Sequence, residues 1–250
     1  MKQFTQNANC FIGTSGWTYE DWAGAFYPKE LPKSKWLEYY ASQFNTVELN
    51  ATFYRSFPQK TYESWYKRTP DNFHFVVKIS RFISHIKKLV DVEESIQKAQ
   101  QSAHGLKEKL GLFLLQLPPK IGYNKELLIS TLAAFSDPSQ LVVEFRNAQW
   151  FNPETYSILK KFNCIACNID SPHLRIYDWV TSDIAYLRLH GHTKMYAYDY
   201  DRRQLNKITD ILDGLKKKGA KKIYVFFNND HFACAPKNAA KLKKIYCQSV

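Results

Sequence analysis

Polar and charged side chains alternate with apolar ones at the ends of several short apolar runs. Glu48 and Asn50 alternate with Val47 and Leu49, so in an extended strand the two pairs lie on opposite faces. The same alternation recurs in three later runs, where the polar pairs are Glu144 and Arg146, Asn168 and Asp170, and Arg188 and His190. The apolar neighbours of these pairs are expected to pack under helices, so the sequence predicts that the polar pairs point together into one cavity.

The charged members of this set balance one another. Lys78, Gln116 and Asn228 end three further runs and join the set, which then holds three acidic and three basic side chains: Glu48, Glu144, Asp170, Lys78, Arg146 and Arg188. Burying such charges is costly unless they pair or meet a ligand. A metal cation would have to displace the basic groups, whereas a phosphate or carboxylate would find them in place. We therefore expect an anionic small-molecule ligand, and neither a metal nor another cofactor.

Chemical type gives each side chain a role. Glu48, Glu144 and His190 are the catalytic candidates, because carboxyl and imidazole groups transfer protons. The substrate-binding candidates are Lys78, Arg146, Arg188, Asn50, Gln116, Asp170, Asn228, Trp17 and Tyr54. If the chain is an enzyme, the expected reaction is metal-independent acid/base or phosphoester chemistry, as in a hydrolase or lyase acting on a phosphate-containing substrate. The alternative is a non-catalytic protein whose internal charges form a purely structural salt-bridge network.

Trp17 and Tyr54 belong to an aromatic-rich part of the chain. Residues 17–66 hold 15 of the 39 aromatic residues, and several stand in the segments that follow the first two apolar runs. Aromatic side chains at the edge of a cavity can stack on a base or a sugar ring. They can equally form a packed lid, since aromatic residues also serve as ordinary core. Both interpretations stay open from the sequence.

The sequence pattern predicts repeated strand and helix units that position these residues. Eight apolar runs, separated by helical patterns, are the expected strands: 10–15, 46–50, 73–79, 112–117, 141–146, 164–170, 185–190 and 222–228. We expect one α/β domain over residues 1–250, folded as a (β/α)8 barrel with an irregular or missing sixth helix, because residues 171–182 have little helical pattern. An open doubly wound sheet is the alternative. In a barrel, chemistry belongs at the carboxyl ends of the strands, which is where the polar pairs stand.

Sequence blocks along nearly the whole chain carry a resemblance. The segment from Gly13 to Trp17, the segment 47–54 and the blocks around Gln116, Glu144 and Asn228 are similar to those of the YecE-like family, a domain of unknown function (DUF72) with a TIM-barrel fold. The resemblance implies that fold and an enzyme-like pocket. The family has no established reaction, so no catalytic residue is carried over. A relationship of similar proteins to barrel endonucleases of the DNA-repair type gives a second alternative, a nucleic-acid-binding protein.

Charge and cysteine content bear on location and partners. The chain has a net charge of +12, and residues 201–250 hold 12 Lys and Arg against four Asp. We expect this basic surface to lie on the far side from the pocket and to bind nucleic acid only weakly and without sequence preference. No apolar run of membrane-spanning length or signal sequence occurs, and five cysteines make no disulfide framework, so we expect a cytoplasmic protein that does not enter membranes. The oligomeric state is left open.

Overall fold

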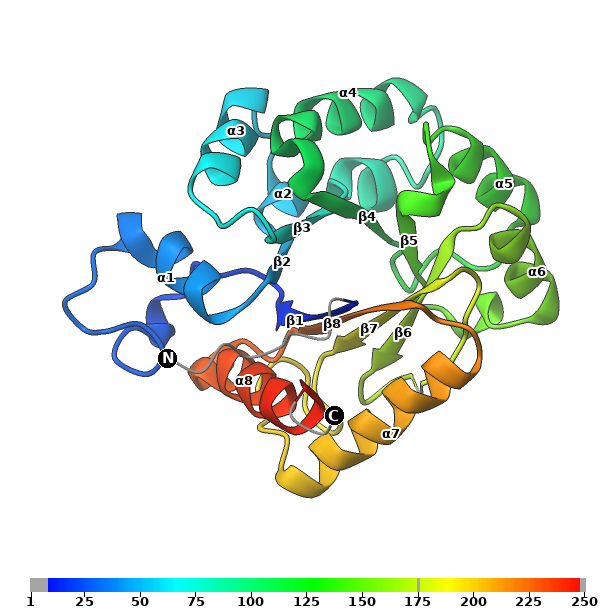
Figure 1. Cartoon of the computed structure of the whole chain (residues 1–250). Coiled ribbons are helices and arrows are strands. Elements are labelled where there is room, and N and C mark those ends of the chain that lie inside the picture. The colour runs from blue at the N-terminus through cyan, green and yellow to red at the C-terminus, as the bar shows by residue number, and fades with distance from the viewer. Residues whose placement is uncertain (1–8, 175, 248–250) are drawn as a thin grey trace.

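Eight parallel strands form a nearly closed barrel in the computed structural model, which describes residues 9–174 and 176–247 (Figure 1). The strands are β1 (Cys10–Thr14), β2 (Thr46–Leu49), β3 (His74–Lys78), β4 (Leu110–Gln116), β5 (Leu141–Glu144), β6 (Ile165–Asp170), β7 (Ile184–Leu189) and β8 (Lys222–Phe227). Each strand pairs with the next along the chain from β2 to β8, and β8 pairs with β1. The expected (β/α)8 barrel is confirmed, and each expected strand is found within about two residues of its predicted bounds.

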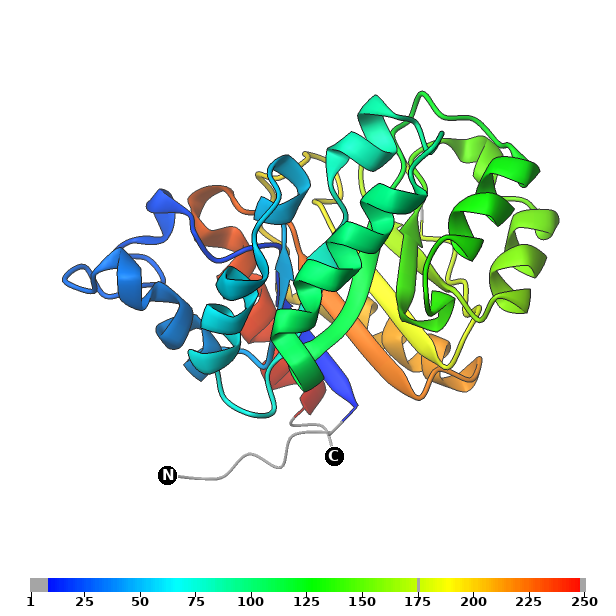
Figure 2. The same ribbon diagram turned by 90° about the horizontal axis from the view of Figure 1, so that it is seen from above.

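Helices surround the strands in both views (Figures 1 and 2). They are α1 (Trp36–Gln43), α2 (Ala51–Tyr54), α3 (Gln59–Lys67), α4 (Glu93–Ala103), α5 (Lys125–Ala133), α6 (Pro153–Lys161), α7 (Arg202–Lys217) and α8 (Cys234–Cys247). Side-chain caps fix the starts of α5, α6 and α7. Asn124 accepts from the Leu127 N–H, Asn152 accepts from the Thr155 N–H ahead of Pro153, and Asp201 forms a capping box with Gln204. In the described part of the chain, no helix has the length and apolarity needed to cross a bilayer.

The connection from β6 to β7 has no helix in its described residues, which confirms the irregular sixth crossover. A loop packs there instead, and the side chain of Asn168 binds the Trp179 backbone twice, at 3.0 and 2.8 Å. Ile169 packs inside the barrel, so Asn168 and Asp170 face outward. The expectation that this polar pair points into the cavity is wrong, because a loop with polar backbone groups, and not an apolar helix, covers β6 on this side.

The seam between β1 and β2 is closed by a side chain. The Tyr40 hydroxyl accepts from the Thr14 N–H at 2.9 Å and donates to the Thr46 carbonyl at 3.0 Å, so it bridges the two strands. A Cβ on Gly13 would lie 2.3 Å from that carbonyl oxygen, which explains the glycine. The close approach of these strands brings the segments that follow them to the same edge of the barrel.

Two apolar layers hold the strands in place. The barrel interior is filled by side chains such as Phe11, Leu114, Tyr186 and Phe226, and a larger cluster lies between the strands and the helices. Cys164 belongs to the outer cluster and Cys167 to the inner one, as expected for residues three apart on a strand. The inner layer ends below the carboxyl ends of the strands, where polar side chains begin.

Candidate active site

Four charged side chains, here called the paired cluster, lie at the carboxyl ends of β2, β5 and β7: Glu48, Glu144, Arg146 and Arg188. Arg188 is fully buried and donates to both Glu48 oxygens, at 2.5 and 3.0 Å, and also to Glu144. Arg146 donates to the second Glu144 oxygen. Tyr186 adds a hydrogen bond to Glu48 at 2.7 Å. The cluster therefore balances two negative against two positive charges within itself.

The two arginines of the paired cluster fix the protonation states of Glu144 and of the neighbouring His190. Burial disfavours the Glu144 carboxylate, but Arg146 and Arg188 outweigh this effect and keep its pKa well below the ordinary value. Burial and the same two guanidinium groups lower the pKa of His190 well below its ordinary value. Nε2 of His190 accepts from Arg146 at 3.0 Å, and Nδ1 lies 2.9 Å from the Asn228 amide. Glu144 therefore stays ionised and His190 stays neutral. Both oxygens of Glu144 and both ring nitrogens of His190 already have hydrogen-bond partners.

Lys78, at the end of β3, is buried beside the cluster but belongs to no ion pair. Its side chain points inward from the strand, and Nζ lies 4.3 Å from the centre of the Phe53 ring. Within residues 9–174 and 176–247, no carboxylate or carbonyl group is hydrogen-bonded to Nζ. Burial, together with the repulsion of Arg188, lowers the pKa of Lys78 to about 7. This amine is therefore near the midpoint of its titration at neutral pH.

A cavity of 390 Å³ opens at this end of the barrel. This mouth cavity is lined by Tyr19, Asp21, Asn50, Tyr54, Lys78, Gln116, Tyr196, Asn228, Asp230 and His231. Three of them, which we call the open wall, carry polar atoms that the protein leaves without hydrogen-bond partners: Asn50, Lys78 and Asp230. The open wall and the paired cluster share the mouth of the barrel, but only the open wall lines the cavity.

Asp230 follows β8 in the segment that packs on the loop after β1. Its backbone carbonyl accepts from Trp22 Nε1 at 2.9 Å, which fixes the residue against that loop. Its Oδ1 atom is buried and receives no hydrogen bond of ordinary geometry from the described residues. Burial raises the pKa of Asp230 to about 8, and the neighbouring Tyr19 hydroxyl offsets part of this rise. Asp230 is therefore largely protonated at neutral pH, in a position where it can exchange a proton with an occupant of the cavity.

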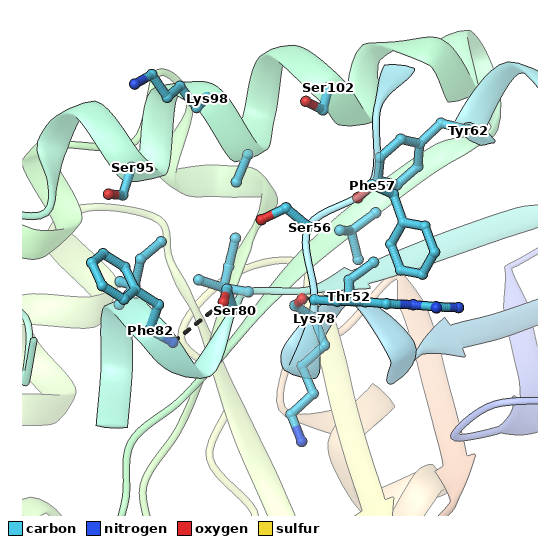
Figure 3. Close-up of a pocket in the computed structure, with 15 residues that line it drawn as sticks. Thr52, Ser56, Phe57, Tyr62, Lys78, Ser80, Phe82, Ser95, Lys98 and Ser102 are labelled. Atoms are coloured by element: carbon cyan, nitrogen blue, oxygen red, sulfur yellow. Dashed lines mark hydrogen bonds between the residues drawn. The ribbon is translucent and has the colours of Figure 1, made fainter. Parts of the chain in front are cut away.

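A second cavity, of 290 Å³, lies outside β3 and is bordered by α4 (Figure 3). Hydroxyl groups of Ser56, Ser80, Ser95 and Ser102 line it among apolar side chains. Lys78 borders both cavities, and Figure 3 shows its side chain running away from Ser95 and Ser102. The amine of Lys78 thus serves the mouth cavity.

The structure divides the residues expected to bind substrate into two groups. Asn50, Tyr54, Lys78, Gln116 and Asn228 line the mouth cavity together. The other expected site residues lie outside its lining: Trp17, Glu48, Glu144, Arg146, Asp170, Arg188 and His190. Trp17 is buried edge-on against Trp65, at 5.7 Å, as part of a packed aromatic layer. Asp170 accepts from the Tyr200 hydroxyl at 2.7 Å on the outer face of β6.

Sequence reasoning did not assign Tyr19, Tyr196 or Asp230 to substrate binding. Asp230 and its neighbour His231 stand directly after a buried strand, and this position at a strand end is the signal that could have pointed to them. Among the residues that the structure describes, no three His, Cys, Asp or Glu side chains are grouped closely enough to hold a metal ion. The polar groups of the open wall can form hydrogen bonds and exchange protons with an occupant of the cavity.

Comparison with known proteins places this barrel in a family. The family model described as "Protein of unknown function DUF72" matches residues 11–249. The UPF0759 protein YunF of Bacillus subtilis is 25% identical over 268 residues, covering 94% of each chain. YecE of Escherichia coli K12 is 29% identical over 143 residues, covering 56% of this chain and 50% of YecE.

A solved structure agrees. The crystal structure of a DUF72 family protein from Thermotoga maritima is similar with a TM-score of 0.86 and 30% identity, covering 95% of this chain and 98% of that one. A DUF72 family protein from Enterococcus faecalis, at 24% identity and a TM-score of 0.82, shares the fold over 96% of each chain. The chain belongs to the DUF72 family.

Proposed function

We propose that the chain is an enzyme that binds a small anionic molecule in the mouth cavity and transfers protons on it with its own side chains. The observation that carries this proposal is Lys78, a buried amine on the cavity wall that forms no ion pair with a described carboxylate. A buried charge is costly unless it is paired, and a ligand phosphate or carboxylate would supply the pair. A phosphate ester is one such ligand.

Asp230 is the proton-transfer group in this proposal. Its pKa of about 8 lies near neutral pH, where a general acid works best, and its side chain lines the same cavity as Lys78. Bringing an anion to Lys78 favours the ammonium form, which raises the pKa of the amine and fixes its charge. Lys78 would then hold the ligand while Asp230 gives or takes a proton. The paired cluster supports the wall behind them.

Anion binding can be tested with sulfate, whose charge does not change near neutral pH. We expect calorimetry at pH 6 to detect sulfate binding that is weakened about thirtyfold or more in Lys78→Met, because a charge-assisted contact is lost, and is kept in Lys78→Arg. Lys98→Met is the matched control. It removes one positive charge near the second cavity, where Lys98 already pairs with Glu94 at 2.7 Å. Equal sulfate affinity in wild type and Lys78→Met would contradict the proposal.

Proton transfer needs a separate test. Phosphorylated and carboxylated small molecules are incubated with the protein in D2O and followed by NMR for deuterium incorporation or product. We expect a molecule that is changed by the wild type to be bound but left unchanged by Asp230→Asn. A reaction that proceeds equally well in Asp230→Asn would remove Asp230 from the mechanism.

A further inference from the structure

Two buried oxygen atoms in the wall of the mouth cavity lack hydrogen-bond donors. They are Oδ1 of Asn50 and Oδ1 of Asp230. The orientation of the Asn50 amide is fixed, because its Nδ2 donates to the Ser15 carbonyl at 3.1 Å and leaves the oxygen as the free side. Buried acceptors without donors are uncommon in proteins and costly, so each needs an explanation.

The neighbouring Tyr19 cannot supply both missing donors. Its hydroxyl donates to the Ser15 carbonyl at 2.6 Å and also lies within hydrogen-bonding reach of Asp230 and Asn50. A hydroxyl group has only one proton to donate, so Tyr19 can serve at most one of these acceptors at a time. Lys78 carries N–H donors in the same cavity, yet it forms no described hydrogen bond with either oxygen. At least one of the two oxygens therefore needs a donor from what fills the cavity.

The unmet groups of the cavity are therefore of two opposite kinds. Lys78 offers positive charge and N–H groups, whereas Asn50 and Asp230 offer oxygen acceptors. One ligand satisfies both only if it carries an anionic group at one end and donor hydrogens at the other. Hydroxyl groups fit a neutral, protonated Asp230 as well as an amide, because they both donate and accept.

Aromatic faces complete the lining. Tyr54 and Tyr196 border the cavity and remain 71% and 38% exposed, which is unusual for large aromatic side chains. Exposed aromatic rings at a cavity give flat apolar contact for a ring whose edge carries polar groups. We infer that the ligand is a polyhydroxylated anion of the sugar phosphate or sugar acid class, with its anionic group on Lys78 and its hydroxyl groups on Asn50 and Asp230. This inference rests on the proposed anion binding at Lys78.

The test compares ligands that differ only in the hydroxylated part. Ribose 5-phosphate is compared with inorganic phosphate, and gluconate with acetate, so that the phosphate and carboxylate sources are distinguished. We expect the hydroxylated anion of at least one pair to bind about tenfold more tightly than the bare anion, from two added hydrogen bonds. O-phosphoethanolamine, which replaces the hydroxyl groups by an ammonium group, should gain less, because ammonium donates hydrogen bonds but cannot accept one from a protonated Asp230.

Variants of the two acceptors locate the gain. Asp230→Leu should lose most of it while leaving the affinity for inorganic phosphate within about twofold, and Asp230→Asn, which keeps an oxygen acceptor, should retain it. If Asp230→Leu does not fold, the affinity gain is measured in Asn50→Ala, which should also reduce it. Asp183→Asn, at the opposite end of the barrel, is a control substitution of an aspartate outside the mouth cavity.

The outcomes separate this inference from the function on which it rests. If the wild type binds none of these anions, both are wrong. If it binds every anion through Lys78 with no gain from hydroxyl groups, the anion site stands, and water alone satisfies the two oxygens. A gain that is largest for O-phosphoethanolamine would overturn the hydroxylated class in favour of an amine-bearing ligand.

Discussion

The two sides of the barrel mouth satisfy their charges in opposite ways. In the paired cluster, Arg188 and Arg146 neutralise Glu48 and Glu144 at hydrogen-bond distance, and these side chains do not line the mouth cavity. In the open wall, Lys78 Nζ lies over an aromatic ring and forms no ion pair with a described residue, and two buried oxygens receive no hydrogen bond from the described residues. Charged residue types alone therefore do not mark a ligand site. A stronger indication is several unsatisfied polar atoms on one cavity wall, since Thr155 and Asn229 each have one such oxygen outside the lining of the mouth cavity.

A second comparison, between two buried lysines, makes the same point. Lys109, next to β4 at the other end of the barrel, donates to the backbone carbonyls of Tyr66 and Thr69, each at 2.7 Å. Lys78 is buried to a similar degree and has no such acceptors. Lys109 thus has a structural explanation within the fold, and Lys78 does not.

Removing Arg188 should have the largest effect. Arg188→Met leaves two buried carboxylates, Glu48 and Glu144, without their shared guanidinium group, so we expect the free energy of unfolding to fall by about 3–5 kcal/mol. Urea denaturation followed by circular dichroism measures this, with Arg203→Met on the exposed side of α7 as the control. A loss under about 1 kcal/mol would show that the paired cluster is not structural.

The two lysines should respond in opposite directions. Lys109→Met leaves two backbone carbonyls unsatisfied and should lower the free energy of unfolding by about 1–3 kcal/mol. Lys78→Met removes a buried charge without a partner and should leave the stability unchanged or raise it. The same urea titrations decide this. If Lys78→Met costs as much as Lys109→Met, Lys78 has a structural role and the contrast fails.

Anion binding should depend on pH with a defined sign. The pKa of Lys78 in the folded protein is about 7, below its ordinary value, so the ammonium form that binds anions is lost as pH rises through 7. We expect sulfate affinity to fall about tenfold from pH 6 to pH 8. Lys78→Arg should remove the part of this dependence that comes from Lys78, because arginine stays charged, and should leave a smaller decrease as Asp230 ionises with a pKa of about 8. A flat profile in the wild type would place anion binding elsewhere.

The smallest effect concerns the basic turn between α7 and β8. Lys216, Lys217, Lys218, Lys221 and Lys222 lie at the end of the barrel opposite the mouth. Lys218 already pairs with Asp178, and Lys221 lies 3.9 Å from Asp183. We expect weak duplex DNA binding that is steeply salt-dependent and disappears when all five become Glu.

Sulfate affinity at the mouth should change by less than about twofold in that variant, because salt screens charges over about 8 Å. Fluorescence anisotropy with labelled DNA measures the binding. DNA binding that survives the charge reversal but disappears in Lys78→Met would mean that nucleic acid enters the mouth cavity.

The barrel and its polar mouth could be predicted from the sequence because they depend on local patterns. Successive side chains of a strand point to opposite faces, and this rule correctly predicted which residues of β2, β5 and β7 face inward. Val47, Val143 and Leu187 lie under the helices, as expected. The same rule failed at β6, where Asn168 serves an outer loop that has no helical pattern. A polar side chain does not show by its type whether it faces a cavity or a loop.

Pairing between distant strands could not be predicted either. Arg188 and Glu48 are 140 residues apart, and only the barrel register brings them to hydrogen-bond distance. Because Arg188 and Glu48 bind each other, neither is free to bind a ligand. Counting acidic and basic residues in the sequence does not reveal this pairing. Asp230 shows the converse, since its importance comes from a missing donor and from burial rather than from a motif.

The charge state of Lys78 tests the central claim most directly. Heteronuclear NMR of labelled lysine side chains, assigned with Lys78→Arg, follows its titration with and without sulfate. We expect a midpoint of about 7 in the free protein and an upward shift when sulfate binds, because an anion favours the ammonium form. A midpoint near the ordinary lysine value of about 10.4, with no response to sulfate, would contradict the claim that Lys78 is the unpaired cation of a ligand site.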